Sequence, residues 1–226
     1  NDTKVSINFV NSEKLDIKNY KRALKKSDAI LVPGGFGDRG IEGMVLAAKY
    51  ARESKTPYFG ICLGLQIAII EMTRSLLKLK DANSTEFKKR VKNNVISLVT
   101  EWKNEDGTIE KRNHKSDKGG TMRLGAQVAF LKNGTLAKSL YKKSSIFERH
   151  RHRYEVNPSY VPELEKHGLI VSARSEMHNL VEMIELKNHP WFVACQFHPE
   201  FTSKPKKGHP LFNDFIKAAE IKRDKK

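Results

Sequence analysis

The residues Pro57-Tyr58-Phe59-Gly60-Ile61-Cys62-Leu63-Gly64-Leu65-Gln66 join a short apolar run to a helical apolar pattern through a Gly-x-Cys-x-Gly turn. This is the pattern of a nucleophile elbow, in which small flanking residues allow a strained bend between a strand and a helix. A thiol at the start of a helix can have a lowered pKa and react as the thiolate at physiological pH. The residues alone leave a second interpretation open, a buried structural cysteine at a helix start.

The length favours one α/β domain with elaborations, and we expect a single domain over residues 1–226. The chain has no run of about 18 apolar residues and no basic-then-apolar leader, so we expect neither a membrane span nor secretion. Its two cysteines, Cys62 and Cys195, cannot form a disulfide framework and are typical of a reducing compartment. These features predict a cytoplasmic location.

The formal net charge of +16 raises the question of nucleic-acid binding, because clustered basic residues gain affinity by releasing counterions from phosphates. The distribution of the charge argues against it. Basic residues are scattered over every predicted helix and loop, and only Lys204–Lys207 and Lys222–Lys226 are locally dense. We interpret the charge mainly as a solvated surface, some of which could face nucleotide phosphates or an acidic partner, and expect no nucleic-acid partner.

Strands and helices alternate through the first third of the chain, which predicts a doubly wound, mostly parallel sheet of the flavodoxin-like α/β class. Ligands of such sheets bind beyond the carboxyl ends of the strands, where Cys62 and the loop Pro33–Gly37 both fall. The two motifs should therefore face one pocket. Strands are expected at Val5–Val10, at Ala29–Val32 and before Cys62, and helices at Ile17–Lys26, at Gly40–Glu53 and after Cys62.

The loop Pro33-Gly34-Gly35-Phe36-Gly37 follows a strand that is apolar throughout. Its three glycines permit a tight turn and leave backbone N–H groups facing the space above the sheet. The loop lacks the Gly-Lys-Ser/Thr ending of a P-loop and the full spacing of a dinucleotide-binding fingerprint. An oxyanion site or a substrate-backbone site therefore fits it better than a phosphate site.

The middle of the chain changes to an antiparallel pattern, which we interpret as hairpins inserted into the α/β fold. Val95–Lys103 should pair with Thr108–Arg112 through the turn Glu105-Asp106-Gly107. Met122–Phe130 should pair with the segment after Asn133-Gly134.

The Arg/His-rich run Glu148–Val156 has the length of a strand. A His-x-His pair can bind a metal, but no third ligand at suitable spacing lies nearby, so we expect no metal site. Period-two alternation would place one set of side chains on each face: Arg149, Arg151 and Arg153 against His150 and His152.

The last third returns to the α/β pattern and places a histidine just beyond a buried strand, with a carboxylate two residues on. Such a pair can supply a base and its orienter to a thiol above the same sheet edge, so Cys62, His198 and Glu200 form a workable nucleophilic triad. His198 alone would more often be structural, and Cys195, among apolar neighbours, is expected in the core. Helices are expected at Pro158–His167 and His209–Ile221, and strands at Leu169–Ala173, Leu180–Leu186 and Trp191–Phe197.

Six stretches carry a family resemblance: Pro33-Gly34-Gly35-Phe36-Gly37 with Arg39-Gly40, Gly60-Ile61-Cys62-Leu63-Gly64-Leu65-Gln66, Asn83-Ser84-Thr85-Glu86-Phe87, Gly119-Gly120-Thr121-Met122-Arg123-Leu124-Gly125, Glu148-Arg149-His150-Arg151-His152-Arg153-Tyr154-Glu155 and Cys195-Gln196-Phe197-His198-Pro199-Glu200-Phe201. With them the chain resembles the class I, or triad, glutamine amidotransferases, and within these the glutaminase domains of CTP synthases. The elbow and His-Pro-Glu are shared by many amidotransferases, whereas the other stretches are more specific. Together they extend from about Asp28 to Ala219.

The resemblance implies the chemistry of the triad. Cys62 would attack the side-chain amide of glutamine, His198 would move protons to the leaving ammonia and then activate water, and Glu200 would orient His198. Backbone N–H groups of Gly35 and Leu63 would donate to the tetrahedral oxyanion.

The resemblance also implies how glutamine is bound. Gln66 would help to hold the substrate, and Glu86 and Arg153 would bind its α-amino and α-carboxylate groups. Their charges suit these contacts, because a guanidinium pairs bidentately with a carboxylate and a carboxylate accepts from an ammonium.

In the family, the ammonia passes to a synthetase module that aminates UTP to CTP with ATP, which implies a role in pyrimidine biosynthesis. The implied partners are L-glutamine and that module, in a full-length enzyme that is a homo-oligomer. ATP, UTP and Mg²⁺ would belong to the module, so no cofactor is expected in this domain. The 226 residues contain no counterpart of the module, and they enter at what resembles the family's second strand.

Three other functions fit parts of the pattern. A glutaminase subunit serving another acceptor would share the triad but should lack the Gly119–Gly125 and Arg149–Tyr154 stretches. A γ-glutamyl peptidase-like hydrolase would use the same nucleophile on peptide bonds. A non-catalytic regulatory or assembly module would have a vestigial pocket, and such a pocket has no chemical reason to keep the triad together with Glu86 and Arg153.

Overall fold

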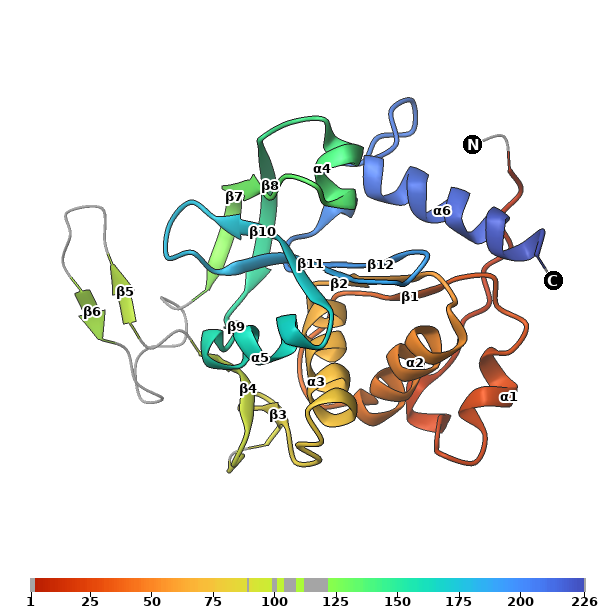
Figure 1. The fold of residues 1–226 in the computed structure, drawn as a ribbon, viewed down its shortest axis with the longest axis horizontal. Coiled ribbons are helices and arrows are strands. Elements are labelled where there is room, and N and C mark those ends of the chain that lie inside the picture. Colours follow the sequence, from red (N-terminus) through yellow and green to blue (C-terminus); the bar gives the residue numbers. More distant parts are fainter. Residues whose placement is uncertain (1–2, 89, 99–100, 104–108, 112–121, 226) are drawn as a thin grey trace.

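A computed structural model describes residues 3–88, 90–98, 101–103, 109–111 and 122–225. The main sheet has seven strands in the order β1-β2-β12-β11-β10-β7-β8 (Figure 1). Its strands are β1 (Ile30–Val32), β2 (Tyr58–Ile61), β7 (Arg123–Leu131), β8 (Ser145–His152), β10 (Leu169–Ser175), β11 (Val181–Leu186) and β12 (Phe192–Cys195).

The main sheet is mixed, which corrects one detail of the expected parallel arrangement. β1, β2 and β12 pair in parallel, whereas every pair from β12 through β11, β10 and β7 to β8 is antiparallel. The reason lies in the connections. β1 and β2 each lead into a long helix, α2 (Ile41–Ser54) and α3 (Leu63–Leu76), and parallel strands require such crossovers. Short turns join β10 to β11 and β11 to β12, and these can only reverse the chain.

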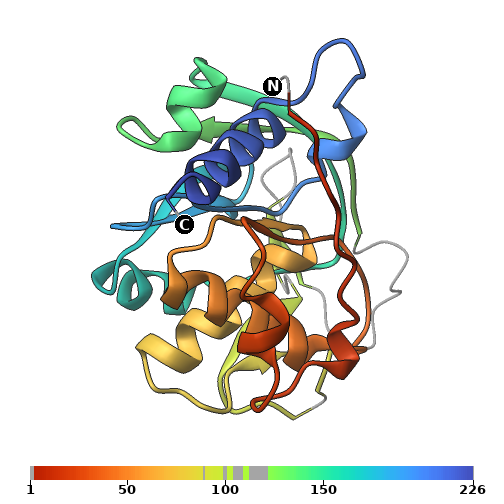
Figure 2. The same ribbon diagram turned by 90° about the vertical axis from the view of Figure 1, so that its right-hand side faces the viewer.

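Helices cover both faces of the sheet, which confirms the flavodoxin-like α/β class (Figures 1 and 2). On one face, α2, α3 and α5 (Val161–Lys166) bury their apolar side chains against the sheet, with α1 (Tyr20–Leu24) beside them. On the other, α4 (Leu136–Tyr141) and α6 (Pro210–Arg223) share a second core with Phe59 of β2 and with Trp191, which precedes β12. No helix of the described residues has the length and apolar character needed to span a bilayer.

The antiparallel end of the sheet curls back toward the end of β12. β8 is the last strand in the sheet order, yet the backbone N–H of His198 donates to the carbonyl of Arg149 in β8 at 2.8 Å. Alternation along β8 places Arg149 and Arg151 on one face and His150 and His152 on the other, as the sequence predicted, and it is the histidine face that is buried. β8 therefore forms a wall beside the residues that follow β12.

The inserted region forms two small sheets. β3 (Asn83–Ser84), β4 (Asn94–Leu98) and β9 (Tyr154–Val156) make one, and β5 (Glu101–Lys103) pairs with β6 (Ile109–Lys111) in the other. The predicted pairing of Val95–Lys103 with Thr108–Arg112 thus holds for β5 and β6 only. The predicted turn at Glu105–Gly107 lies outside the described residues.

Other predicted elements differ in extent. β7 pairs with β8, but the short helix α4 lies between them, because Thr135 accepts from the backbone N–H of Lys138 and caps it. Arg153 leaves the predicted strand at the bend between β8 and β9. The helix predicted at Pro158–His167 is a 3-10 turn, η2 (Pro158–Tyr160), followed by α5.

The strand predicted at Val5–Val10 is wrong. The segment pairs with no described strand, and its side chains point largely to solvent, with Phe9 90% exposed. Its alternation of apolar and polar residues is real, but a strand also needs a neighbour to accept its hydrogen bonds. A short 3-10 turn, η1 (Ser12–Lys14), follows it.

Candidate active site

Cys62 occupies the strained bend that the Gly-x-Cys-x-Gly pattern predicts. It follows β2 and precedes α3, and its backbone has a positive φ of 52° with ψ of −99°. Positive φ is unfavourable for a residue with a side chain and is typical of functional sites. The Cys62 N–H donates to the carbonyl of Cys195 at 2.7 Å, which fixes the bend to β12. A Cβ at Gly64 would lie 2.2 Å from Val32 O, so α3 can approach the sheet only with glycine there.

His198 and Glu200 lie just beyond β12, as expected. His198 is buried, and its Nδ1 lies 2.6 Å from Glu200 Oε1 in the 3-10 turn η3 (Pro199–Phe201). Phe201 stacks on the imidazole with ring centroids 4.9 Å apart. The other ring nitrogen, Nε2, is buried and has no hydrogen-bond partner among the described residues. The imidazole is therefore oriented from one side and available for proton transfer on the other.

Gly34 shows that Cys62 and His198 share one small space. A Cβ built on Gly34 would lie 2.7 Å from His198 Cε1 and 3.5 Å from Cys62 Cβ. The first distance is a steric clash, so the loop after β1 can lie this close to His198 only because residue 34 is glycine. The glycine loop therefore lies beside both Cys62 and His198 at this edge of the sheet.

Burial disfavours the thiolate of Cys62 in the free protein. Loss of solvation is the main cause that raises the pKa of the thiol to about 12, and the nearby carboxylates of Glu155, Glu200 and Glu86 contribute to this rise. A hydrogen bond from the Leu63 N–H acts in the opposite direction. The pKa lowering expected from the sequence is therefore not found in the free protein.

Glu86 and Arg153 come together although they are far apart in the sequence. Glu86 Oε1 accepts from the backbone N–H of Gly37 at 3.0 Å. Burial raises the pKa of Glu86, whereas this hydrogen bond and the charge of Arg153 lower it. The carboxylate of Glu86 thus lies beside the glycine loop and is influenced by the charge of Arg153, and both side chains are partly buried.

Gly35, Leu63 and Gln66 also lie around the elbow. A Cβ on Gly35 would be 3.0 Å from Leu63 Cδ2, so the glycine loop runs over the first residue of α3. Gln66 is buried one turn further along α3, and its Nε2 donates to Tyr154 O at 3.1 Å and to Gln196 Oε1 at 3.4 Å. Both hydrogen bonds of the Gln66 amide nitrogen are thus made to other residues of the protein.

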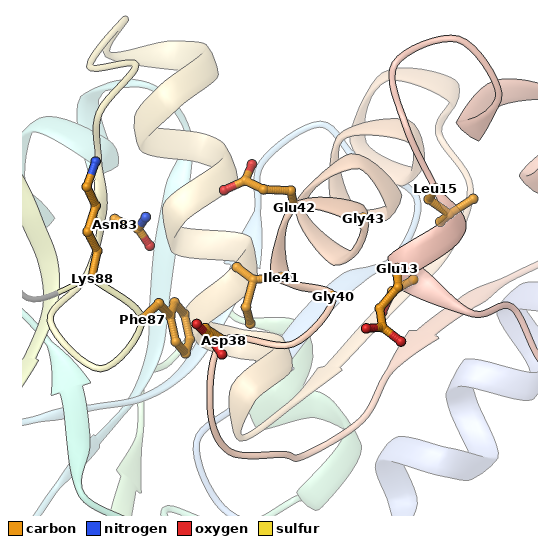
Figure 3. Close-up of a pocket in the computed structure, with 11 residues that line it drawn as sticks. Glu13, Leu15, Asp38, Gly40, Ile41, Glu42, Gly43, Asn83, Phe87 and Lys88 are labelled. Carbon is orange, nitrogen blue, oxygen red and sulfur yellow. The ribbon is translucent and has the colours of Figure 1, made fainter.

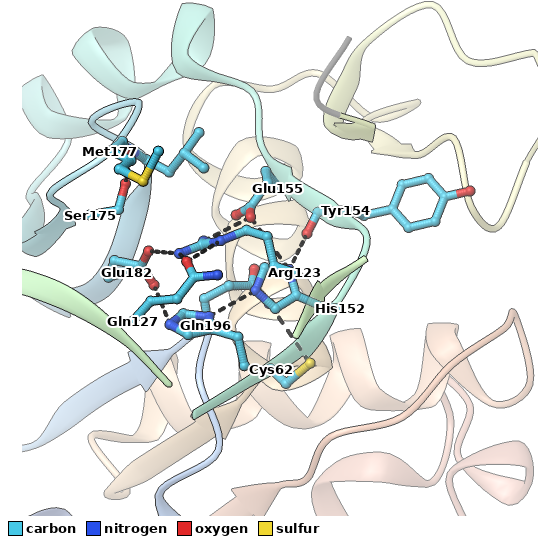
Figure 4. Close-up of polar contacts among 12 residues, drawn as sticks. Cys62, Arg123, Gln127, His152, Tyr154, Glu155, Ser175, Met177, Glu182 and Gln196 are labelled. Carbon is cyan, nitrogen blue, oxygen red and sulfur yellow. Dashed lines mark hydrogen bonds and ion pairs between the residues drawn. The ribbon is translucent and has the colours of Figure 1, made fainter. Parts of the chain in front are cut away.

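A buried ionic cluster lies next to this network (Figure 4). Arg123 donates to Glu155 at 2.9 Å and to Glu182 at 2.6 Å, and all three side chains are almost completely buried. Burial raises the pKa of Glu155 to about 7, although the charge of Arg123 lowers it. Sequence reasoning did not assign this cluster, but charged residues within apolar strands are a signal that could have indicated it.

The buried rings of His150 and His152 contact each other. His150 Nδ1 lies 3.0 Å from His152 Nε2, and His152 Nδ1 lies 3.1 Å from Tyr154 O. Burial lowers the pKa of both rings, and the charge of Arg123 lowers it further. Both imidazoles are therefore neutral at pH 7. No group of three candidate metal ligands occurs among the described residues.

A separate pocket of 420 Å³ opens between η1, the start of α2 and the loop after β3 (Figure 3). Glu13, Asp38 and Glu42 place three carboxylates around it, and Phe87 forms part of its wall. Two of these carboxylates already pair with arginines, Glu13 with Arg39 and Glu42 with Arg74. Neither Cys62 nor His198 is among the described residues that line it.

Comparison with known proteins identifies the class. The sequence matches the family described as glutamine amidotransferase class-I over residues 1–218, and the chain belongs to this family. Among solved structures it is similar to the glutaminase domain of Trypanosoma brucei CTPS with bound acivicin, with 37% identity and a TM-score of 0.86. That alignment covers 97% of this chain and 82% of the other.

A more distant similarity concerns the fold alone. A putative GMP synthase protein from Thermoplasma acidophilum has 17% identity and a TM-score of 0.56. The alignment covers 91% of this chain and 79% of that protein.

Proposed function

We propose that this chain hydrolyses L-glutamine to glutamate and ammonia with Cys62 as nucleophile, His198 as proton carrier and Glu200 as its orienter. The observation that carries the proposal is the position of Gly34 beside both Cys62 and His198, where an added Cβ would meet both side chains, together with the 2.6 Å contact between His198 Nδ1 and Glu200 Oε1. The membership of the chain in the amidotransferase family supports the choice of substrate.

The first half of the reaction forms a thioester. As the sulfur attacks the amide carbon, the thiol proton moves to His198 Nε2, which has no other described partner. Backbone N–H groups of Gly35 and Leu63 stabilise the oxyanion of the tetrahedral intermediate. His198 then gives its proton to the amide nitrogen, the C–N bond breaks, and ammonia leaves.

The second half releases glutamate. His198 takes a proton from a water molecule as that water attacks the thioester carbon. The C–S bond breaks, and the sulfur leaves with the proton that His198 held. Glu200 keeps Nδ1 of the ring protonated throughout, so that Nε2 is the atom that exchanges protons.

We propose that charged groups select the amino-acid end of glutamine. Glu86 would accept from the α-ammonium group and Arg153 would bind the α-carboxylate. Gln66 would help to hold the substrate through its carbonyl oxygen, because its nitrogen is already bonded to Tyr154 and Gln196.

The test is ammonia release from glutamine by the purified chain. Cys62→Ser should abolish turnover with the fold intact, because a serine hydroxyl is a far weaker nucleophile than a thiol in this setting. Cys195→Ala is the matched control, since Cys195 is fully buried in the core, and it should keep most of the activity. Turnover by Cys62→Ser at the wild-type rate would overturn the proposal.

We further propose that the ammonia serves a CTP synthase synthetase domain, which supplies the sites for ATP, Mg²⁺ and UTP in pyrimidine biosynthesis. The similarity to the CTPS glutaminase domain supports this partner. We also propose that the activity is cytoplasmic and that the full-length enzyme is a homo-oligomer that binds neither nucleic acid nor membrane.

The transfer can be tested by combining the chain with a CTP synthase synthetase domain, ATP, Mg²⁺ and UTP. Nitrogen-15 from amide-labelled glutamine should enter CTP even with excess unlabelled ammonium in solution, because channelled ammonia does not mix with the bulk. Dilution of the label to the level of the bulk ammonium would contradict the transfer while leaving glutamine hydrolysis intact.

A further inference from the structure

Gln196 contacts the sulfur of Cys62 from inside the protein. It follows β12 and is completely buried, and its Nε2 lies 3.8 Å from Cys62 Sγ, within the range of an N–H···S hydrogen bond (Figure 4). Its backbone N–H donates to Glu182 O at 2.8 Å, which fixes the position of the main chain. A buried amide among the apolar residues of this strand needs a reason, because burying an unpaired polar group is costly.

The direction of the side-chain hydrogen bonds is determined by Tyr154. A backbone carbonyl can only accept, so the group of Gln66 that contacts Tyr154 O must be its NH₂. The same NH₂ group donates to Gln196 at 3.4 Å, and that contact must therefore be the oxygen of Gln196. The NH₂ of Gln196 consequently faces Cys62 Sγ.

We propose that Gln196 is a positioning residue for the nucleophile, holding the sulfur of Cys62 with an N–H donor that Gln66 keeps in the correct orientation. The proposal rests on the proposed glutamine hydrolysis. In this proposal Gln66 has two roles: it orients the amide of Gln196, and it contacts the substrate.

The sulfur of Cys62 needs a second hydrogen-bond donor because the Leu63 N–H is also a proposed donor to the oxyanion. In the free protein the Leu63 N–H bonds to the thiol. When it turns to the oxyanion, the sulfur would lose its hydrogen bond in a buried site that already contains the carboxylates of Glu155 and Glu86. Gln196 is completely buried and is not one of the proposed oxyanion donors, so it can keep its contact with the sulfur through both halves of the reaction.

The test measures how readily Cys62 forms a thiolate, independently of glutamine. Alkylation of Cys62 by iodoacetamide is followed by peptide mass between pH 6 and 9.5, so that the rate reports the thiolate fraction. Gln196→Met keeps the approximate size of the side chain but removes the donor. It should raise the thiol pKa by about one unit, which slows alkylation about tenfold at each pH below the pKa.

Three further variants distinguish a lost orientation of Gln196 from a general disturbance of the buried region. Gln66→Met should slow alkylation in the same direction, because Gln196 is no longer held with its NH₂ toward the sulfur. The double variant should be no slower than Gln196→Met alone, since both changes act on one hydrogen bond. Gln127→Met is the matched control: Gln127 accepts from Arg123 in the same buried region without a described contact to Cys62, and its alkylation curve should superimpose on the wild type.

Each outcome decides the proposal. If Gln196→Met alkylates like the wild type, or if the Gln66 and Gln196 effects simply add, the proposal is overturned. If Gln196→Met does not fold by circular dichroism, Gln66→Met decides alone, and a wild-type curve for it overturns the proposal. Glutamine hydrolysis by the same wild-type sample separates the two levels: its absence would contradict the proposed function, whatever the alkylation curves show.

Discussion

Replacing Gly34 by alanine should disable the site by moving His198. The new Cβ would lie 2.7 Å from His198 Cε1, whereas an ordinary contact of this kind is about 3.4 Å, so the imidazole must shift by several tenths of an ångström. A misplacement of about 1 Å at a reacting group can reduce a rate about 10²-fold. We therefore expect kcat for glutamine hydrolysis to fall by roughly 30- to 100-fold.

The assay is steady-state ammonia release, with circular dichroism to establish the fold. Gly35→Ala is the matched control, because it keeps the backbone N–H and its Cβ meets the flexible end of Leu63 at 3.0 Å. It should lose less than about tenfold in kcat, since a leucine methyl can move aside. A folded Gly34→Ala protein with wild-type kcat would refute the view that Cys62 and His198 share the space beside Gly34.

Three further variants test other parts of the site. Arg153→Ala should raise the KM for glutamine about 10- to 100-fold with little change in kcat, because it removes a charge-assisted contact made in the ground state; an unchanged KM in steady-state kinetics removes Arg153 from the binding site. Glu200→Gln should lower kcat about 10- to 100-fold, since an amide orients the imidazole but does not stabilise its charge; a wild-type kcat contradicts the orienting role. Burial raises the folded-state pKa of Glu155 from 4.5 to about 7, so the folded state retains a proton that the unfolded chain loses. Relative to Glu155→Gln, the unfolding free energy of the wild type should thus fall as pH rises from about 4.5 to 7 in urea titrations, and parallel pH profiles would contradict the raised pKa.

The sequence was most informative where each element has a local cause. The buried run before Cys62 and the two flanking glycines predicted a strand, a strained bend and a helix, and the structure contains all three. The position of His198 beyond β12 followed from the same logic, because residues at the carboxyl ends of adjacent parallel strands are brought to one edge of the sheet.

The sequence was least informative where the outcome depends on a distant partner. Val5–Val10 alternates as a strand does, yet no described neighbour pairs with it. The prediction of a low thiol pKa for Cys62 was wrong for the same reason. Segments far away in the chain bury the thiol and bring the carboxylate of Glu155 near it, and both effects raise its pKa. Gln196 was overlooked because its role depends on a contact with Gln66, 130 positions earlier.

The most direct test of the central claim is the mass of the intact protein after incubation with a glutamine-mimicking diazoketone, followed by peptide mapping. A nucleophilic thiol in an assembled glutamine pocket should give one adduct, located on Cys62 and suppressed by excess glutamine. An adduct on Cys195, labelling that glutamine does not suppress, or no adduct on a demonstrably folded chain would contradict the claim that Cys62 is the nucleophile of a glutaminase site.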